Sequence, residues 1–517
     1  NLYSISPYWV DILLWFFIGI SPSLLIYFYH QERLSRRIVK LREKILIPLN
    51  LVILMIALYF GFGNSDLGAT TKDIAFKNDS GTIETKTITK EEFRVGVPIY
   101  SFEQIKTDST TAWLSYGIGR LLKEDLQQNK NISPSCDNIT STPTKIREAS
   151  LFYDRYVDGT YEKVESNYNI TVNIRKATNS KILKERTFTG PDVLVLLDDI
   201  SVYIASNVGV IENNDLIYLD LPINEFMSNS LAALKAYVNG DFRTAYDIDQ
   251  RFALAYLEDA KRTIVYNRGI LEARDVIDKA VALKNELPLQ KQLEVFIQRS
   301  LAYGNYKDAE QQVKLQLEVD PSNSFYNNVL FAIYSETKNI EAYLTASEEL
   351  FRRNPNADNG LNLAQAAMLN GEDDQLLNAI KAYELINPAV KPIKLEPLIF
   401  KGNTAEAQNV FENYKLSNPN NENRCIPYDS IFDYLETSTL AAANLKQFVG
   451  FYRSENNEQV SELWIHNNRL VESIKNQSMR PFLPAGKDAI GGGFLQNTTF
   501  FRTLIKDKNG RPIGLRT

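Results

Sequence analysis

Histidine and cysteine are scarce in this chain, which leaves few side chains for nucleophilic or metal chemistry. The 517 residues include two histidines, His30 and His466, and two cysteines, Cys136 and Cys425. Four such residues spread over the chain do not make a zinc cluster. His466 can act as a general base only beside a nucleophile and an orienting carboxylate, and the sequence names neither. We therefore expect an exposed, inert His466, no catalytic residue, no metal and no cofactor. A disulfide between the cysteines is left open.

An acidic run and a pair of glycines are the other places where an ion or a nucleotide can bind. Glu372-Asp373-Asp374 lacks the alternating oxygen ligands of a calcium-binding loop. It follows Gly371 directly, so we expect the acidic first turn of a helix, which the helix dipole favours. Gly117 and Gly119 lie within a helical pattern rather than in a loop after a strand. We expect close packing at these two glycines and no phosphate site.

The clearest candidates for partner binding are aromatic and amide side chains in the middle of the chain: Tyr303, Tyr306, Tyr326, Asn327, Asn328 and Tyr334. On a curved helical surface such side chains would contact an extended peptide or a partner helix. Tyrosines at helical spacing are also common core residues, so packing between helices is the competing interpretation. The elements that position these residues decide between the two.

The helices that would position these side chains are indicated by a sequence repeat of about 34 residues. A glycine is followed 17 residues later by a proline three times, and a fourth pair has lysine in the glycine slot: Gly304 and Pro321, Lys338 and Pro355, Gly371 and Pro388, Gly402 and Pro419. We expect the glycine to let two helices pack closely, and the proline to end the second helix. The spacing resembles tetratricopeptide (TPR) repeats. It predicts a TPR-like α-solenoid over residues 216–439, with a generic helical bundle as the alternative.

Two apolar runs at the start of the chain are long enough to cross a membrane. They cover residues 8–29 and 45–62, and the loop between them holds six basic and two acidic residues, which favours a cytoplasmic loop. Everything after Asn64 then lies outside the cytoplasm, and one further crossing upstream of Asn1 would place the true N-terminus inside. We expect a transmembrane hairpin over residues 1–66 that contacts membrane lipid through residues 8–62. A buried hairpin in a soluble domain is the alternative.

The bulk composition narrows the class of function. The chain is 44% hydrophobic and 23% charged, so a packed core is available throughout. Its length predicts two to four domains. The net charge of −6 and the pI near 5.4 argue against a nucleic-acid-binding protein, which carries a basic surface.

A polar linker is expected over residues 67–92, followed by a small α/β domain over residues 93–215. Sequence patterns predict strands at residues 93–102, 153–164, 168–176 and 182–188, and helices at 111–128 and 191–208. Asp158-Gly159 is a turn signal. We favour a spacer that holds the solenoid away from the membrane over a ligand-binding domain.

The order of these segments resembles a bacterial family. The stretches "RVGVPIYSFEQ…WLSYGIGRLLKEDL", "YDRYVDGTYEKVESNYNITVNIRKATNSKILKERTFTG" and "VLVLLDDISVYIASNV" resemble the TolB- or FlgO-like N-terminal domain, which is followed by TPRs in bacterial inner-membrane proteins. The run "YWVDILLWFFIGISPSLLIYFYHQER" resembles the membrane hairpin that precedes that domain. The resemblance covers residues 8–420, implies an assembly or sensing module, and supplies no catalytic residues. It departs at residues 97–102, where relatives tend to have a more compact Leu-Pro-Phe.

Residues 440–517 change to a β pattern. Short strands are predicted at residues 460–465, 469–474, 494–501 and 503–505, with hairpin turns at Asn467-Asn468 and Asn509-Gly510. The three glycines at residues 491–493 are expected at a flexible hairpin tip, with a close-approach site as the alternative. The segment resembles the small β-barrel-like module appended to some serine-hydrolase-related proteins, in which its role is accessory.

These features predict a multidomain chain with a transmembrane helical hairpin, a small α/β domain, a TPR-like α-solenoid and a C-terminal antiparallel β module. We expect an inner-membrane-anchored scaffold or adaptor, not an enzyme, that binds a protein partner in a periplasmic multiprotein complex. The alternative is a transmembrane sensor whose cytoplasmic output domain lies upstream of this sequence. A hydrolase built on the β module around His466 is a third hypothesis.

Overall fold

The computed structural model describes residues 6, 8–31, 40–63, 65, 67–77, 83–129, 131–136, 142, 146, 150, 153–208, 221–266, 270–321, 323–353, 357–384, 388–419, 422–438, 444–453, 460–474, 479–493 and 499–516. The chain divides into two compact units, Asn1–Val95 and Gly96–Thr517. The predicted domain boundaries at 66/67, 92/93, 215/216 and 439/440 stay predictions.

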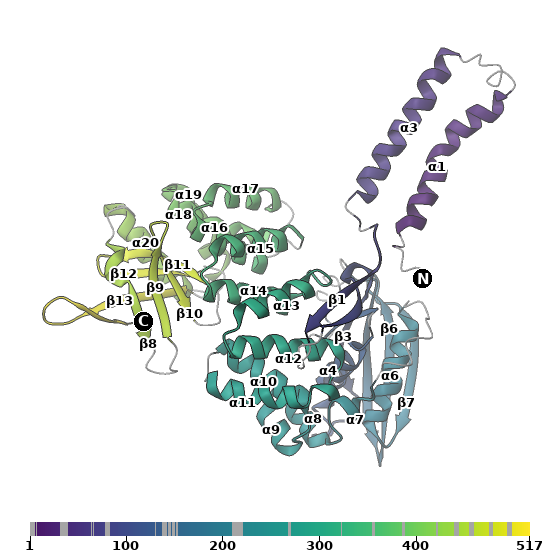
Figure 1. Ribbon diagram of the computed structural model, residues 1–517, viewed down its shortest axis with the longest axis horizontal. Helices are drawn as coiled ribbons and strands as arrows, with labels where there is room; N and C mark the ends of the chain where they lie inside the picture. The colour runs from purple at the N-terminus through teal and green to yellow at the C-terminus, as the bar shows by residue number, and fades with distance from the viewer. Residues whose placement is uncertain are drawn as a thin grey trace. The chain divides into compact units, whose positions relative to one another are not determined.

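Two long helices dominate the first unit. Helix α1 (Tyr8–Tyr29) and helix α3 (Leu41–Phe62) pack side by side (Figure 1). Both are long and apolar enough to cross a membrane, as their composition predicts. Most of their large apolar side chains are exposed, whereas a core helix of a soluble domain would bury them.

A small polar contact joins these two helices. Asn50 Nδ2 of α3 donates hydrogen bonds of 2.9 Å to the Gly19 carbonyl oxygen and to Ser23 Oγ of α1. A Cβ atom at Gly19 would lie 2.4 Å from Leu54 Cδ1. Small residues four apart let the two backbones approach, a pattern that is common in pairs of membrane helices.

The segment predicted as a polar linker contains a β-hairpin, which its composition did not predict. Strand β1 (Thr71–Lys77) pairs with strand β2 (Ile83–Thr89) in an antiparallel register from Thr71 opposite Thr89 to Lys77 opposite Ile83. The composition suggested a linker because lysine and threonine are abundant. In IETKTIT, however, threonine recurs at every second position as Thr85, Thr87 and Thr89, and β-branched residues favour strands.

The second unit begins with a five-stranded mixed sheet. Its order is β4-β3-β5-β6-β7, with β3 and β5 parallel and the β5–β6 and β6–β7 pairs antiparallel. The strands are β3 (Val95–Gln104), β4 (Ile132–Cys136), β5 (Arg155–Val164), β6 (Asn167–Lys176) and β7 (Ile182–Gly190). Helices α4 (Leu114–Leu126) and α6 (Val193–Asn207) pack on each other, α4 against β4 and α6 against β6 and β7. All the predicted strands and both helices of this segment are confirmed, and β4 was missed.

The predicted turn at Asp158-Gly159 is wrong, because both residues lie inside β5. Gly159 is required by packing instead: a Cβ there would lie 2.2 Å from the Thr171 carbonyl oxygen and 2.3 Å from Phe102 Cε1. The chain turns later, at Glu165, which has a left-handed φ of 54°. A glycine that the sheet needs for close contact therefore resembled a turn signal in the sequence.

A run of helices follows the sheet, and from α8 to α20 each helix packs on the next. We call α8–α20 the helical array. The helices are α7 (Ile223–Phe226), α8 (Leu231–Val238), α9 (Phe242–Ile248), α10 (Ala253–Tyr266), α11 (Ile270–Ala282), α12 (Leu289–Ala302), α13 (Tyr306–Leu317), α14 (Ser324–Glu336), α15 (Ile340–Arg353), α16 (Ala357–Asn370), α17 (Asp373–Tyr383), α18 (Leu395–Phe400), α19 (Thr404–Ser417) and α20 (Glu422–Thr437). An apolar stripe explains each packing face; in α15 the buried positions are 340, 343, 344, 347, 350 and 351.

Five turns in the array share one geometry. Each has a residue with a left-handed φ: Gly240 (77°), Gly304 (74°), Lys338 (54°), Gly371 (85°) and Gly402 (78°). At each turn the following N–H donates to the carbonyl five residues back, as in the 2.8 Å bond from Asn305 N to Ser300 O, which defines a Schellman motif. We call these the Schellman turns.

The predicted reason for these glycines is wrong, although their positions are periodic. A Cβ added at any of the four glycines meets no atom within 4 Å, so close packing does not require them. Glycine is favoured because it adopts a left-handed φ without the steric cost that a side chain adds. Lys338 in the glycine slot has the same backbone conformation, so the slot is defined by φ and not by space.

The chain ends in a seven-stranded antiparallel sheet with strand order β14-β13-β12-β11-β10-β9-β8, which we call the β module. The strands are β8 (Gly450–Arg453), β9 (Val460–His466), β10 (Arg469–Ile474), β11 (Arg480–Gly486), β12 (Ala489–Gly493), β13 (Thr499–Lys506) and β14 (Pro512–Arg516). The predicted antiparallel module and its Asn467-Asn468 turn are confirmed. The glycines at residues 491–493 lie in strand β12 rather than at a hairpin tip. There Gly491 approaches Ala485, Ile431 and Pro427.

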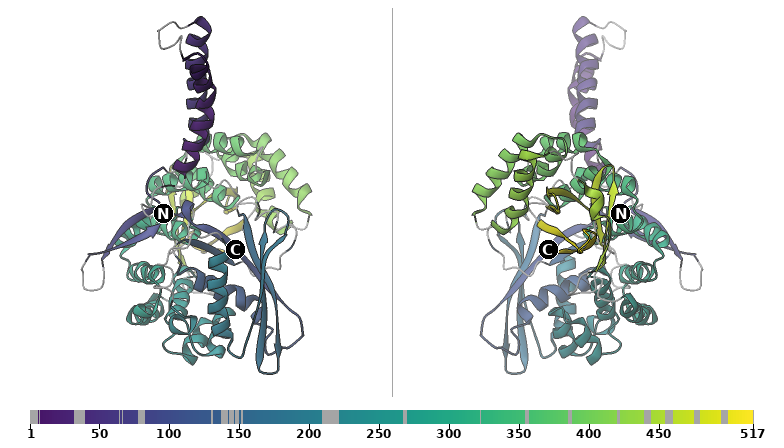
Figure 2. Two further views of the ribbon diagram at one scale, coloured as in Figure 1. Left: turned by 90° about the vertical axis from the view of Figure 1, so that its right-hand side faces the viewer. Right: turned by 90° about the vertical axis from the view of Figure 1, so that its left-hand side faces the viewer.

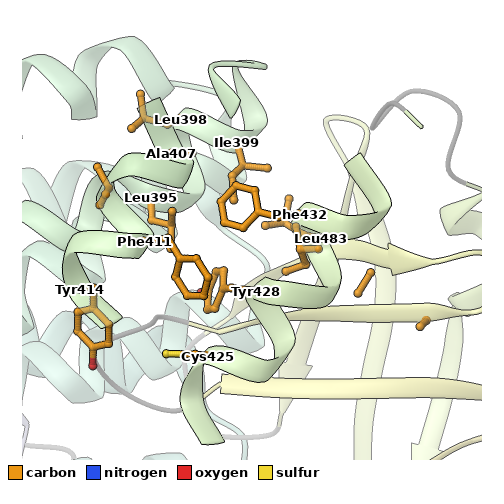
Figure 3. Packing of buried hydrophobic residues seen from close by; sticks show 14 residues of the cluster. Leu395, Leu398, Ile399, Ala407, Phe411, Tyr414, Cys425, Tyr428, Phe432 and Leu483 are labelled. Atoms are coloured by element: carbon orange, nitrogen blue, oxygen red, sulfur yellow. The ribbon is translucent and has the colours of Figure 1, made fainter. Parts of the chain in front are cut away.

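One face of the β module is closed by the last helix of the array. Helix α20 packs on β11, β12 and β13, and the two views of Figure 2 place the yellow strands beside the green helices. The Phe411 ring packs at a tilt against the rings of Tyr428 and Phe432 in the shared core, where Leu483 of β11 joins them (Figure 3). The module and the end of the array therefore share one hydrophobic core.

Candidate functional site

Three of the six predicted partner-binding residues are buried in the array. Tyr326, Asn327 and Tyr334 are 5%, 5% and 2% exposed. Asn327 Nδ2 donates 2.9 Å bonds to the carbonyl oxygens of Pro321 and Asn323, which fixes the start of α14. The structure therefore gives these three side chains the core role of the competing interpretation.

The other three candidates do not form one surface. Tyr303 is 41% exposed, and its hydroxyl lies 2.5 Å from the Asp278 carboxylate. The half-buried Tyr306 hydroxyl lies 3.3 Å from Glu336, and burial together with this carboxylate raises the pKa of Tyr306 to about 12. Tyr303 and Asn328 are the exposed members of the set.

Arginine side chains instead mark the places where other domains dock on the Schellman turns. Arg120 of α4 donates 3.2 Å from Nη1 to the carbonyl oxygen of Val238, at the end of α8. Its guanidinium carbon lies 5.1 Å from the centre of the Tyr237 ring. The negative end of a helix attracts a cation, and the aromatic face adds to that attraction. The α/β domain thus holds the first turn of the array.

Arg469 of β10 repeats this arrangement at the other end of the array. It donates to the carbonyl oxygen of Met368 in α16, pairs with Asp373 of α17, and lies 4.2 Å from the centre of the Phe400 ring of α18. Burial raises the pKa of Asp373, while Arg469 acts in the opposite direction. The acidic run is thus the first turn of α17, as predicted, and in addition binds the β module.

A buried ion network joins the α/β domain to the array. It contains three carboxylates, Glu124 of α4, Glu258 of α10 and Glu294 of α12, and two ammonium groups, Lys261 of α10 and Lys291 of α12. Lys291 Nζ lies 3.4 Å from Glu124 and 3.5 Å from Glu294, and Lys261 Nζ lies 2.8 Å from both Glu258 and Glu294. Burial raises the pKa of Glu258, but the two lysines outweigh it and lower this pKa to about 2.

A second buried ion group lies inside the β module. Glu472 is fully buried, and its carboxylate pairs with Arg480 at 2.7 Å and with Arg502 at 2.5 Å. Burial lowers the pKa of Arg480. Arg480 of β11 lies opposite Glu472 of the neighbouring strand β10, whereas Arg502 is on β13, so the second pair joins two strands that are not adjacent in the sheet.

The other residues that the sequence singled out as possible chemical or binding groups are two glycines, His466 and the two cysteines. A Cβ at Gly117 would lie 2.8 Å from Trp113 and one at Gly119 3.1 Å from Cys136 Sγ, which confirms close packing. His466 ends β9 and is half-buried against the Trp464 ring, rather than fully exposed as predicted, because the strand turns its ring toward that neighbour. Cys136 and Cys425 are both thiols. No group of three or more metal-binding side chains occurs among the described residues.

Sequence reasoning missed Arg120, Arg469 and the network around Lys291. The pairs that join different domains, Arg120 with Val238, Arg469 with Asp373 and Lys291 with Glu124, lie more than 90 positions apart, and spacing within one segment carries no information about such pairs. One irregularity was visible in the sequence: position 338 of the repeat has lysine where the other repeats have glycine. Such an exception could have indicated that the side chain at this turn contacts another part of the protein.

Comparison with known proteins adds little to this arrangement. No family model matches the chain, and no curated protein matches it. Two solved structures of a PelC dodecamer from Paraburkholderia phytofirmans align with 23% of the chain at 12% and 13% identity, covering 91% and 90% of their own chains, with TM-scores of 0.19 and 0.18.

Proposed function

We propose that the protein is a scaffold or adaptor of the bacterial inner membrane, and that its periplasmic part binds a protein partner through a TPR-like solenoid. The observation that carries the proposal is the set of Schellman turns. Those at Gly304, Lys338, Gly371 and Gly402 follow one another after 34, 33 and 31 residues, close to the TPR period. Stacked helix pairs of this kind present an extended surface that suits protein binding.

The apolar helices support membrane anchoring. Helices α1 and α3 have the length and hydropathy of membrane spans, and the basic residues between them favour a cytoplasmic loop. The unit Gly96–Thr517 would then lie in the periplasm. We propose that its five-stranded sheet domain is the TolB- or FlgO-like domain that the sequence resembles.

Charge indicates what kind of partner fits the array. Residues 216–439 include 32 acidic and 22 basic side chains, whereas residues 440–517 include 6 acidic and 11 basic ones. The negative charge of the protein is therefore concentrated in the array. A partner with a basic surface would associate faster and in a preferred orientation, and salt would weaken its binding.

The anchor is tested by fractionation and topology. The full chain should stay in the membrane pellet after alkaline carbonate extraction, and deletion of residues 8–62 should release it. A reporter fused after Thr517 that is active only in the periplasm should be active. A soluble full chain, or an inactive reporter whose fusion is stable, would contradict the anchor or its orientation.

Binding is tested by cross-linking in native membranes, purification of the tagged full chain, and mass spectrometry. A partner found in this way should bind the purified protein directly, with an affinity that falls as salt rises. Tyr303→Ala and Asn328→Ala change exposed candidates and should weaken that binding if the surface around them is used. A protein that remains monomeric and captures nothing reproducibly would rule out the scaffold.

A further inference from the structure

Lys338 is the exception among the five Schellman turns. The other four have glycine at the left-handed position, and Lys338 adopts this conformation with φ 54°. A side chain at such a position strains the backbone, because its Cβ approaches the following carbonyl. Backbone strain at one position of an otherwise regular pattern persists when contacts of the side chain offset its energetic cost.

The Lys338 side chain reaches the β module. Its Nζ lies 2.9 Å from Glu462 Oε1 and 4.9 Å from the centre of the Trp464 ring. Both partners are on β9, more than 120 residues further along the chain. Glycine at this turn would relieve the strain but would lose both contacts.

The tip of the β9–β10 hairpin makes a second attachment. Asn467 and Asn468 form the tip with φ of 47° and 61°, as a type I′ turn requires. Asn467 Nδ2 lies 3.3 and 3.2 Å from the carbonyl oxygens of Leu369 and Asn370, which end α16. Arg469, the next residue but one, adds the contacts to α16, α17 and α18 described above.

We propose that the β9–β10 hairpin is an internal strap that holds the last helix pairs of the array at a fixed spacing. It touches the end of α14 through Lys338, the end of α16 through Asn467, and α18 through Arg469. In a stacked array each repeat contacts only its neighbours, so the spacing of distant repeats depends on the sum of small rotations. A strap across three pairs removes that freedom, and its release lets the pairs move apart. The proposal concerns the array itself and holds whether or not it binds a partner.

Hydrogen exchange on the purified full chain tests the strap with three glycine substitutions. Lys338→Gly removes the docking side chain and relaxes the backbone, so without a strap it would stabilise its turn. Asn467→Gly keeps the left-handed tip and removes the docking amide. Asn468→Gly is the matched control, because this residue shares the exposed left-handed tip and, within the described part of the chain, its side chain makes no hydrogen bond or ion pair with the array.

Lys338→Gly and Asn467→Gly should make the amides of β9 and of the last turn of α14 exchange about three- to tenfold faster, since local opening controls exchange. Asn468→Gly should exchange like the unmodified protein. Unchanged or slower exchange in both docking variants would overturn the proposal, and so would equal acceleration in the control.

Spin labels test the spacing itself. Glu341 of α15 and Gln408 of α19 are exposed positions in the first and the last of the strapped helix pairs, and Cys136→Ser removes the more accessible native thiol. The distance distribution between labels at these positions should be narrow in the otherwise unmodified chain and broader with Lys338→Gly or Asn467→Gly. Equal widths in all three proteins would show that the hairpin does not set the spacing.

Discussion

Replacement of Lys291 by methionine should be among the most destabilising single changes in the second unit. Its side chain is 10% exposed, and those of its partners Glu124 and Glu294 are 5% and 12% exposed. Methionine has a similar volume, so the apolar contacts of the lysine stem are largely kept. The charge is lost, and the three buried carboxylates are left with Lys261 and with the more distant Lys123, whose Nζ lies 4.0 Å from Glu124.

The expected loss of unfolding free energy is about 3–5 kcal/mol, the cost of breaking a buried ion pair by removing one partner. Most of this loss comes from the carboxylates left without compensation. Lys291→Met combined with Glu124→Gln should therefore recover much of the stability, because the buried charges are then again nearly balanced. The two changes should be strongly non-additive, since their side chains are in contact.

Urea unfolding of the full chain in detergent measures the loss, and hydrogen exchange assigns it to α4, α10 and α12. Arg251→Ala is the matched control: its pair with Glu286 is also between charged side chains, but Arg251 is 78% exposed and its removal should leave the urea midpoint unchanged. A loss below about 1 kcal/mol for Lys291→Met, or a double variant less stable than the single one, would refute the reasoning.

Three further predictions concern other parts of the protein. Gly304→Ala should destabilise the array by about 1 kcal/mol through its left-handed φ alone, measured by urea unfolding, since the added methyl group meets no atom; an unchanged midpoint would argue against backbone strain. Burial and the neighbouring carboxylates Asp259 and Glu336 raise the pKa of Tyr246 and of Tyr306 to about 12. The unfolded chain releases these protons near pH 10, so the stability that the two tyrosines contribute should be complete below pH 10 and be lost as the pH rises to about 12. The urea midpoint of unfolding should therefore drop across this window, and it should drop less in Tyr306→Phe. Asn50→Leu should loosen the α1–α3 pair by about 0.6–1.7 kcal/mol, since two bonds between membrane helices are lost; slower disulfide formation between cysteines placed on α1 and α3 would show it, and an unchanged rate would contradict it.

Local patterns in the sequence predicted most of the elements but not how they fit together. The strands at 155–164, 167–176 and 182–190 and the helices at 114–126 and 193–207 follow from hydrophobic period, which depends on neighbours along the chain. Strands β8, β11, β12 and β14 were missed. Of these, β11 reads RPFLPAG and β12 reads AIGGG, and proline and glycine normally indicate loops. Here contact with α20 supplies the stability that the local sequence lacks.

The candidate site was harder to predict than the fold. The glycine slots of the repeat were found, but a glycine kept for its φ and a glycine kept for close packing look the same in a single sequence. Tyr334 and Tyr303 also look alike there, although one is core and the other exposed. Pairs such as Arg469 with Asp373 join segments 96 residues apart, so only the folded chain reveals them.

The shared core of α20 and the β module has a consequence for the order of synthesis. Every strand of the module pairs with its neighbour in sequence, so the sheet can form as its last residues leave the ribosome. Helix α20 emerges earlier, and its apolar side chains pack on α19 as well as on the module. A nascent chain that stalls between α20 and the module would expose the face of α20 that packs on β11, β12 and β13, and this apolar face would be open to chaperones and proteases.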